Sequence, residues 1–456
     1  MNVRIWAMTV VLGSSSLLSA QDRPTLSFAP IDPPSTSNAA APQTLPSPGV
    51  VAAERMTLDQ VISTTLLADP KLRSAFEEIT QSKGDLWTAG LRPNPTFSPG
   101  GQFLPLTHPF TVDRTGGPPE LDLGASWQLD WFLFGKRAAA IVAANKQLRA
   151  TEQDYYDTVR QRIRDAALAF YDILEAQGLA EQARQDLQNL QKVENVTQRA
   201  VENGGRAQVE LNRIRLDRLR SDQTLREAIG LATTNRSKLR AFLGRSDSDS
   251  SFDIIGSLDL PAVKPNLTTD EAFAIAQENR PDILSLRWKI DKAQADTIVE
   301  HRKAFPEVTA KLGYSRQFQT RAIGMPDANS YFTGVDVTLP IFDRNQGNRL
   351  KASSNLAQSQ YDYQAGLVDL RAEIEQVLTE LRMAQATAEA AGGEQLKLAG
   401  EVLDAITKAY AAGGRPLLDV LDAQRNFRDT YRLYITSRAN YWRASVKLSA
   451  TLGKKL

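Results

Sequence analysis

Two carboxylates, Asp419 and Asp422, follow a glycine pair in the segment YAAGGRPLLDVLDAQR, which runs from Tyr410 to Arg425. Neighbouring acids can act as a general acid and a general base, but that chemistry needs a pocket that shapes a substrate. The same acids also have a purely structural interpretation. The glycine pair can end one helix and the proline after it can begin the next, so that the acids lie near a helix N-terminus.

The rest of the composition argues against catalysis and against a metal site. The 456 residues include no cysteine, which excludes disulfides, thiolate ligands and a cysteine nucleophile. The two histidines, His108 and His301, lie far apart in the sequence, so we expect no internal metal site. No nucleophile motif or phosphate-binding loop accompanies the acid pair, so we expect neither an enzyme nor a cofactor. A formal net charge of +1 gives no electrostatic indication of a nucleic-acid partner.

The N-terminus resembles an export signal. In MNVRIWAMTVVLGSSSLLSAQ a basic residue, Arg4, precedes an apolar run that closes with small residues at Ser19 and Ala20. This predicts a cleaved signal peptide over residues 1–20 and a flexible leader, rich in Pro, Ala, Ser and Thr, over residues 21–55. A membrane anchor is the alternative, but the apolar run is short and is broken at Gly13. No later stretch approaches ~20 continuous apolar residues, so any membrane span is expected to be built from strands.

The rest of the chain is an internal duplication. The stretch Met56–Pro95 aligns with Leu267–Pro306 without a gap, so that Pro70 falls on Pro281. A shared pattern of this length indicates two structural repeats. The expected organisation is a first repeat at 56–243, a linker at 244–266 and a second repeat at 267–456.

Each repeat contains a stretch in which apolar and polar residues alternate. In the second repeat the alternation runs from Val308 to Tyr314 and again from Tyr331 to Ile341, which predicts a β-hairpin at about 307–342. The equivalent hairpin of the first repeat is expected at about 96–134, where Pro99 and two glycines weaken its first strand. The lengths suit either a half-buried soluble hairpin or strands that cross a membrane.

Two very long helical patterns follow the strands, from Ala138 to about Glu202 and from Leu350 to about Ala412. A helix of roughly 60 residues is ~90 Å long, so these rods must pack side by side rather than form one compact core. Each rod ends at a Gly-Gly-Arg turn, and helical-hairpin tips are expected at 204–206 and 413–415. Charges along the rods are expected on a solvated face, such as those of Arg160, Arg162 and Arg164.

The count of strands has a consequence for assembly. Two hairpins supply four strands, whereas a single-chain barrel in a membrane needs about eight or more. Every strand edge in lipid must be paired. If these strands enter a membrane, several copies of the chain must therefore share one barrel.

Over about Met56–Leu456 this layout resembles the TolC-type outer-membrane efflux channels. The segments that carry the resemblance are VTLPIFDRNQGNR (Val337–Arg349), WQLDWFLFGKR (Trp127–Arg137) and the tip segment described above. Within the family, PIFDRNQGNR looks most like the subgroup paired with heavy-metal and cation exporters. The first repeat departs from the pattern, because Asp130 stands where the second has Pro340, and this predicts a differently shaped junction.

The resemblance implies a mainly α fold with a small β part, in which a strand hairpin and a long helical hairpin occur twice. It implies a homotrimer whose twelve strands form one outer-membrane β-barrel and whose twelve helices form a periplasmic α-barrel. Such a trimer is a passive efflux duct for metal cations or small toxic compounds. Its partners are a periplasmic adaptor (a membrane fusion protein), an inner-membrane pump of the RND type and outer-membrane lipid, and this chain has no cysteine to carry a lipid anchor.

The resemblance also assigns roles at the tips. The positions of Asp419 and Asp422 line the tunnel entrance, where threefold symmetry would turn each into a ring of carboxylates that favours cations. Tyr410 and Arg415 match gate positions, and Glu210 matches the acid that they reach on the first hairpin. The tip glycines match positions that adaptors contact; they are Gly204, Gly205, Gly413 and Gly414.

A second function remains open from the residues alone. A soluble periplasmic coiled-coil adaptor or interaction protein would also contain long helical hairpins. An adaptor would normally have one hairpin between small β domains, rather than two equivalent repeats with membrane-length strands. Dependence of the purified protein on detergent separates the two alternatives.

Overall fold

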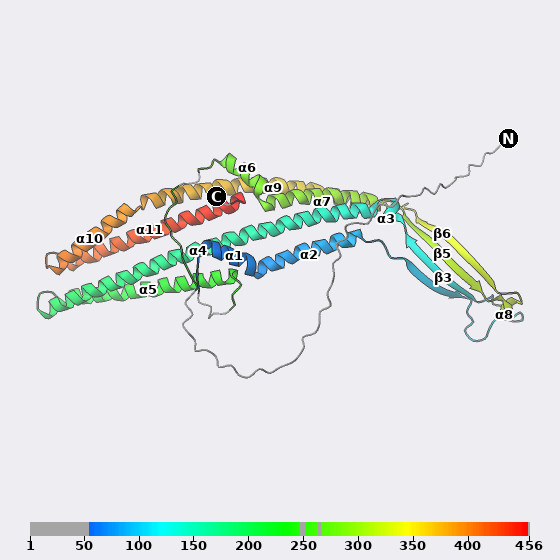
Figure 1. Cartoon of the computed structure of the whole chain (residues 1–456), viewed down its shortest axis with the longest axis horizontal. Helices are drawn as coiled ribbons and strands as arrows, with labels where there is room; N and C mark the ends of the chain where they lie inside the picture. The colour runs from blue at the N-terminus through cyan, green and yellow to red at the C-terminus, as the bar shows by residue number, and fades with distance from the viewer. Residues whose placement is uncertain (1–53, 247–251, 263–265, 455–456) are drawn as a thin grey trace, which may run out of the picture. The chain divides into compact units, whose positions relative to one another are not determined.

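The computed structural model describes residues 54–246, 252–262 and 266–454, which contain two strand-and-helix repeats (Figure 1). The first repeat contains β1 (Glu54–Met56), α1 (Leu58–Ala68), α2 (Pro70–Gly90), β2 (Thr96–Gln102), β3 (Glu120–Gln128), α3 (Asp130–Leu133), α4 (Lys136–Glu202) and α5 (Gln208–Phe242). The second contains β4 (Phe252–Ile254), α6 (Thr269–Asn279), α7 (Pro281–Lys303), β5 (Glu307–Gln317), α8 (Gln319–Ile323), β6 (Ala328–Thr338), α9 (Gln346–Ala390), α10 (Gly393–Ala411) and α11 (Leu417–Leu452). The expected signal peptide and nearly all of the leader lie outside the described residues.

The two short helices of each repeat begin in the same way. Thr57 and Thr268 each cap the first helix through a reciprocal capping box, with Gln60 and Glu271 as the partners. A proline then opens the second helix, which is the position where a missing N–H is harmless. The repeated sequence therefore gives repeated backbone geometry.

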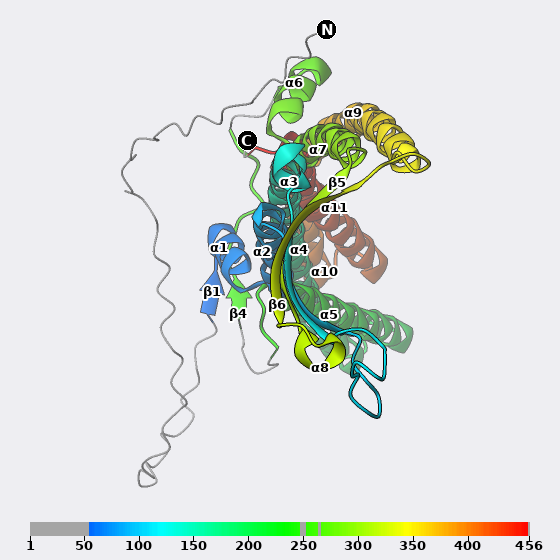
Figure 2. The ribbon, with the colours of Figure 1, turned by 90° about the vertical axis from the view of Figure 1, so that its right-hand side faces the viewer.

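The larger sheet has the antiparallel order β2-β3-β5-β6, so the two hairpins lie next to each other through the β3–β5 pair. The first strand forms despite its Pro-Gly-Gly stretch and pairs with β3 from Thr96 to Gln102. Figure 2 shows that β5 and β6 form a curved band. The outer strands, β2 and β6, each pair on one side only among the described strands.

The two faces of this sheet differ in polarity. Registers place Leu123, Leu312 and Val335 on one face, and their side chains are exposed. The opposite face carries Asp122, which accepts a hydrogen bond from Gln102, and an ion pair between Lys311 and Asp336. The sheet therefore has an uncovered apolar face and a charged, hydrogen-bonded face.

The long helices follow the sheet and differ between the repeats. Helix α4 is continuous over 67 residues. The expected single rod from Leu350 to Ala412 is instead interrupted at Ala391 and Gly392, where Gly392 adopts an extended conformation (φ −56°, ψ 166°) between α9 and α10. The prediction of one continuous second helix was therefore wrong.

Helix α7 packs between α4 and α9, and α2 packs on α4, as Figure 1 shows. The buried residues form three clusters along the helices. One lies among α6, α7, α9 and α11, and one among α1, α4, α5 and the small parallel sheet of β1 and β4. The third lies at the hairpin tips. None of the described helices combines the length and the apolar character needed to cross a membrane.

The strand-to-helix junctions differ as Asp130 suggested. In the first repeat Asp130 begins the short helix α3 and forms a 2.7 Å ion pair with Lys136. In the second repeat no helix lies between β6 and α9 among the described residues. Both long helices nevertheless begin after a left-handed residue, Gly135 in one and Asn345 in the other.

Candidate functional site

The two hairpin tips are built by the same backbone motif. Gly204 (φ +73°) and Gly413 (φ +81°) are left-handed, which suits glycine because it has no Cβ. The next glycine donates its N–H to the carbonyl five residues back, Gly205 to Ala200 at 2.8 Å and Gly414 to Ala409 at 2.9 Å. Each long helix therefore stops at a defined residue and the chain reverses at once.

The arginine that follows each glycine pair lies against an acid one helical turn further on. Arg206 lies 3.6 Å from Glu210, and Arg415 lies 3.3 Å from Asp419. Glu210 and Asp419 are thus equivalent positions of the duplication. The signal was present in the sequence as a repeated Gly-Gly-Arg with an acid four residues later.

Arg206 is one of the residues through which the two tips touch. Its guanidinium lies over the ring of Tyr410, 4.7 Å from the centroid, and its Nη2 donates to the carbonyl oxygen of Arg415 at 3.1 Å. It also pairs with Glu210. Sequence reasoning treated Arg206 only as part of a turn and missed this role.

Tyr410 is buried in the same place. Only 4 % of its surface is exposed, and its hydroxyl lies 2.7 Å from that of Thr197 on α4. Because Thr197 donates its own proton to the carbonyl of Val193, the Tyr410 hydroxyl is the donor in this contact. The ring packs in the tip cluster with Leu190, Val193, Leu211, Ile214, Leu417, Val420 and Leu421.

The structure brings some of the expected tip residues together and leaves others apart. Within one copy, Tyr410 and Glu210 are joined through Arg206, whereas the side chain of Arg415 binds Asp419. Asp422 lies 3.7 Å from Arg425 and its side chain is 54 % exposed. Each acid of the expected entrance therefore has its own arginine and an accessible side.

Glu210 has spare bonding capacity. Its Oε2 is buried, has no hydrogen-bond partner and lies beyond hydrogen-bond distance from Arg206. A buried carboxylate oxygen without a hydrogen bond is unfavourable, and a further donor could reach this one only if neighbouring side chains moved.

A polar group that sequence reasoning missed lies below the tip, where α4, α5 and α11 meet. Asp186 is buried and accepts hydrogen bonds from Ser221 at 2.8 Å and from Gln424 at 2.9 Å, while Arg428 lies 3.9 Å away. Because the side chains come from three helices distant in sequence, no local pattern could have identified them. The described residues contain no group of three or more acidic or histidine side chains arranged to hold a metal ion.

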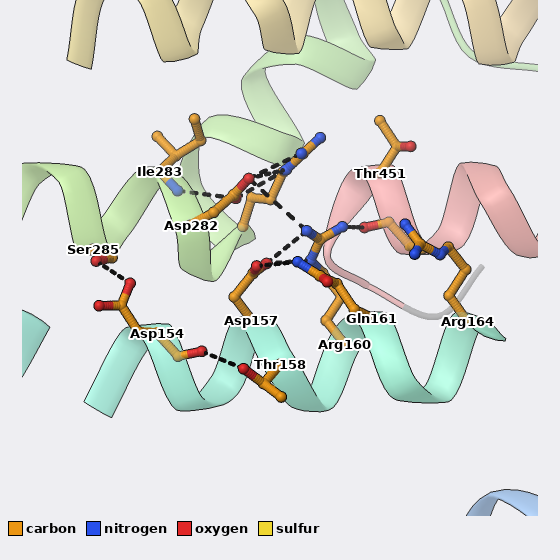
Figure 3. Close-up of polar contacts among 12 residues, drawn as sticks. Asp154, Asp157, Thr158, Arg160, Gln161, Arg164, Asp282, Ile283, Ser285 and Thr451 are labelled. Carbon is orange, nitrogen blue, oxygen red and sulfur yellow. Dashed lines mark hydrogen bonds and ion pairs between the residues drawn. The ribbon is translucent and has the colours of Figure 1, made fainter. Parts of the chain in front are cut away.

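A chain of alternating charges joins the two repeats further along α4. Arg160 donates to Asp157 at 2.6 Å and to the carbonyl of Ala450 at 2.9 Å, and lies 3.8 Å from Asp282 (Figure 3). Asp282 in turn binds Arg280. The prediction of a solvated face at Arg160 and Arg162 was wrong, because the side chains are 11 % and 15 % exposed and both are paired.

Arg280 extends this chain to α9. It donates to Glu373 at 2.6 Å and makes two contacts of its Nε and Nη2 with Asp282 at 2.9 Å. Burial opposes the charge of Arg280, but the two acids outweigh it and raise the pKa of the guanidinium. The network therefore stays charged and ties α4, α7 and α9 together.

Comparison with known proteins gives a family match over both repeats. The model of a family described as "Outer membrane efflux protein" matches residues 114–245 and 273–454, which together are more than half of the chain. The cobalt-zinc-cadmium resistance protein CzcC of Cupriavidus metallidurans is 26% identical over 404 residues, which cover 88% of this chain and 91% of that protein. The outer membrane protein TolC of Vibrio cholerae is 23% identical over 410 residues, with 84% and 88% covered.

Solved structures share the fold. A structure of CusC, reported in connection with transmembrane channel formation, has a TM-score of 0.71 at 18% identity and covers 87% of this chain and 92% of that chain. The open state of the Neisseria gonorrhoeae MtrE outer membrane channel has a TM-score of 0.66 at 18% identity, with 88% and 89% covered.

Proposed function

Because this chain belongs to the outer membrane efflux protein family, we propose that three copies form the outer-membrane duct of a tripartite export system. The expected resemblance to TolC-type channels is confirmed by the family match and by the relatives. The proposal adds the trimer, its partners and its cargo. A periplasmic adaptor and an inner-membrane pump of the RND type would complete the system, and lipid would surround the barrel.

The observation that carries this proposal is the four-stranded curved sheet. One of its faces is apolar and uncovered, the other is charged, and both outer strands have an unpaired edge among the described strands. An unpaired edge is not tolerated in lipid, and four strands are too few to close a barrel. Three sheets joined β2 to β6 would give a closed barrel of twelve strands with the polar face inside.

The helices support the same assembly. In one copy α7 lies between the rod of its own repeat, α9, and the rod of the other repeat, α4. Helix α2, its counterpart, contacts α4 and leaves Phe76 and Trp87 exposed, while α9 leaves Tyr361 and Val368 exposed. If the duplication extends to the assembly, α9 of a neighbouring copy covers α2 as α4 covers α7.

The contact between α7 and α4 within one copy predicts the register of the contact between α2 and α9 of a neighbouring copy. Ser285 on α7 donates to Asp154 on α4 at 2.6 Å. The repeat positions equivalent to these two residues are Ser74 on α2 and Ala365 on α9, and both are exposed in one copy. We therefore expect Ser74 of one copy to lie beside Ala365 of the next.

Cysteine cross-linking tests the trimer directly, because the chain has no cysteine of its own. The double variant Ser74→Cys with Ala365→Cys should form covalent dimers and trimers on oxidation or with a short bis-thiol linker. Each single variant should stay monomeric on a denaturing gel. The control, Ser74→Cys with Ser354→Cys, moves one thiol about 16 Å along the same face of α9 and should cross-link poorly.

The alternative function gives a different outcome. A soluble periplasmic adaptor would purify without detergent, would not conduct in planar bilayers and would show no cross-linked trimer. Those three results together would overturn the duct.

At the tips, we place the tunnel entrance at Asp419 and Asp422 and the gate at Tyr410, Arg415 and Glu210. The accessible sides of the two acids support the entrance, and the contacts of Arg206 with both Tyr410 and Glu210 support a gate at these residues. The glycines Gly204 and Gly413, with Gly205 and Gly414, would form the adaptor-docking surface. A Cβ placed on Gly204 or Gly413 would meet no atom within 4 Å, so open space surrounds them in a single copy.

We propose metal cations as the cargo class. The support is the name of the relative CzcC, a cobalt-zinc-cadmium resistance protein, together with acids at the entrance. Deletion of the gene should lower resistance of the host to divalent transition metals more than resistance to organic compounds. The reverse order would reject this cargo and leave the duct intact.

A further inference from the structure

The junction between the two short helices of each repeat occurs twice, with its charges reversed. In the first repeat Asp69 ends α1 and begins α2, and in the second Arg280 ends α6 and begins α7. Both residues are buried, with 1 % and 7 % exposed. A proline follows each of them.

The backbone around the two junctions is equivalent. The last helix of each repeat ends at a left-handed glycine, Gly244 (φ +63°) and Gly453 (φ +69°). A Cβ on Gly244 would lie 2.4 Å from the carbonyl oxygen of Ala68, and one on Gly453 would lie 2.8 Å from that of Asn279. Ala68 and Asn279 directly precede the charged residues, so the same close contact supports both junctions.

Each buried charge binds the rod of its own repeat. Asp69 on the first junction accepts from Arg162 on α4 at 2.5 Å. Arg280 on the second donates to Glu373 on α9 at 2.6 Å. Both pairs of equivalent positions, Asp69 with Arg280 and Arg162 with Glu373, are 211 residues apart, so the two ion pairs match in place and differ in polarity.

Neighbouring groups hold these charges in place. Asp69 also accepts from the N–H of Lys71, and Arg162 lies over the ring of Phe242 at 4.3 Å. In the second repeat, Glu373 accepts from Thr451 at 2.8 Å. The charged groups therefore cannot easily turn away from an unfavourable partner.

The two short-helix pairs have similar sequences and backbones, and the two rods are similar too. The reversed polarity of the ion pairs is a feature by which they differ. A short-helix pair on its own rod brings opposite charges together. The same junction at the equivalent position of the other rod would bring Asp69 to Glu373 or Arg280 to Arg162. The side chains of Asp69, Arg162 and Arg280 are at most 15 % exposed and that of Glu373 is 37 % exposed, so like charges brought together here are unfavourable.

We propose that this reversed pair of ion pairs directs the start of α2 to α4 and the start of α7 to α9, so that the two short-helix pairs do not exchange places. The four residues are thus specificity determinants of helix packing. The inference goes beyond the efflux function and holds whether or not the duct is a trimer.

Charge exchange in the full-length protein tests it. The double variant Asp69→Arg with Arg162→Glu gives both repeats the polarity of the second, and Arg280→Asp with Glu373→Arg gives both the polarity of the first. In each variant the ion pair with the rod stays attractive, but the two repeats no longer differ in polarity. Asp282→Asn is included in every chain compared, because Asp282 binds Arg280 and would repel an aspartate in its place. The quadruple variant exchanges all four residues and restores the distinction with inverted signs.

The readout is refolding from urea into detergent micelles, measured as the fraction recovered as one protease-resistant species on size exclusion. We expect several-fold lower recovery for both double variants and, for the quadruple variant, recovery near that of the Asp282→Asn reference. If the four residues contribute only local packing, each substitution lowers recovery further, and the quadruple variant is recovered less well than the double variants. A quadruple variant at or below the doubles, or doubles that refold normally, overturns the proposal.

Discussion

Arg206 makes three different contacts at the hairpin tips, and its side chain is only 18 % exposed. A cation over an aromatic ring contributes about 0.5–2 kcal/mol, and a hydrogen bond from a charged donor contributes about 1.5–3 kcal/mol. The residue therefore holds the two hairpins together more firmly than any exposed ion pair on the rods, which is worth about 0–1 kcal/mol.

Replacement of Arg206 should loosen the contact between the two hairpin tips. We expect Arg206→Ala to lower the free energy of unfolding by about 2 kcal/mol in urea titrations and to raise the resting conductance in planar bilayers. Arg220→Ala is the matched control, because Arg220 lies on α5, the helix that follows the turn of Arg206, is 67 % exposed and pairs with Asp217 one turn away. Its effect should stay within about 0.5 kcal/mol. Equal effects of the two variants would contradict the role of Arg206.

Glu300 gives a prediction on pH dependence. Its carboxylate accepts from Asn345, the left-handed residue that begins α9, and from Lys303 at 2.7 Å. Burial raises the pKa of Glu300, but these hydrogen bonds outweigh it and hold the pKa below its ordinary value of 4.5. Since the folded pKa is the lower one, the stabilisation is present above the unfolded pKa and is lost as pH falls through the folded pKa.

The variant Glu300→Gln should therefore be less stable than the unmodified protein at pH 7, by about 1 kcal/mol. The difference should shrink between about pH 5 and pH 3, where the native carboxylate takes up its proton. Urea titrations across this range measure it. A difference that stays constant with pH would show that charge at this position does not contribute.

Among the individual residues of the tips, the sequence predicted the glycines but not the contacts of Arg206. Gly204 and Gly413 were identifiable because a left-handed helix end needs glycine. The role of Arg206 was not, because its contacts with Tyr410 and the Arg415 carbonyl depend on how two hairpins more than 200 residues apart pack together.

Among the elements, the interrupted helix α9–α10 has a cause in the duplication. The ion-pair positions Arg162 and Glu373 are 211 residues apart, whereas the tip glycines Gly204 and Gly413 are 209 apart, so the part of the second rod between its ion pair and its tip is two residues shorter. Two residues correspond to about 200° of helix rotation and about 3 Å of length. The break at Gly392 resets the rotation, and its extended backbone recovers part of the length, since an extended residue rises about 3.3 Å.

Restoring the two residues should make the break unnecessary. Replacing Gly392 by three alanines adds two residues, and we expect a continuous helix with higher helical content by circular dichroism and unchanged expression. Replacing Gly392 by two alanines adds one residue, which leaves the lower part of the helix turned by about 100° and should destabilise the fold. If both insertions behave alike, the length of the rod does not explain the break.

The heptad pattern predicted long helices, but it could not locate this break. Apolar residues continue on both sides of Gly392, and the change in phase is visible only when the two repeats are compared position by position. The strands were more predictable, because alternation between β5 and β6 specifies both the pairing and the polarity of each face.

For the molecule as a whole, three surfaces are left uncovered in one copy. They are the apolar face of the sheet, the side of α2 that carries Phe76 and Trp87, and the side of α9 that carries Tyr361 and Val368. A monomer in water would not leave such surfaces exposed. These uncovered surfaces are the reason that the four strands and the twofold repeat indicate assembly of several copies. The residues of one chain do not identify the pump and the adaptor.

In the assembled duct, Asp419→Asn with Asp422→Asn should weaken block of the pore by divalent cations. We expect a shift of about tenfold in the blocking concentration, which corresponds to ~1.4 kcal/mol. Planar bilayer recordings provide the measurement. Asp429→Asn is the control, because Asp429 lies on the same helix further from the tip and is 68 % exposed. Unchanged block in the double variant would reject the carboxylate rings.

The interruption at Gly392 also decides how the molecule carries mechanical load. The first hairpin contains α4, an unbroken strut of 67 residues that transmits a push along its whole length. The second hairpin contains two helices, α9 and α10, that meet at Gly392, and compression along their axis would bend the chain where they meet. A partner that presses on both tips would therefore leave the first hairpin straight and bend the second at Gly392, so that one hairpin acts as the fixed post and the other as the moving part.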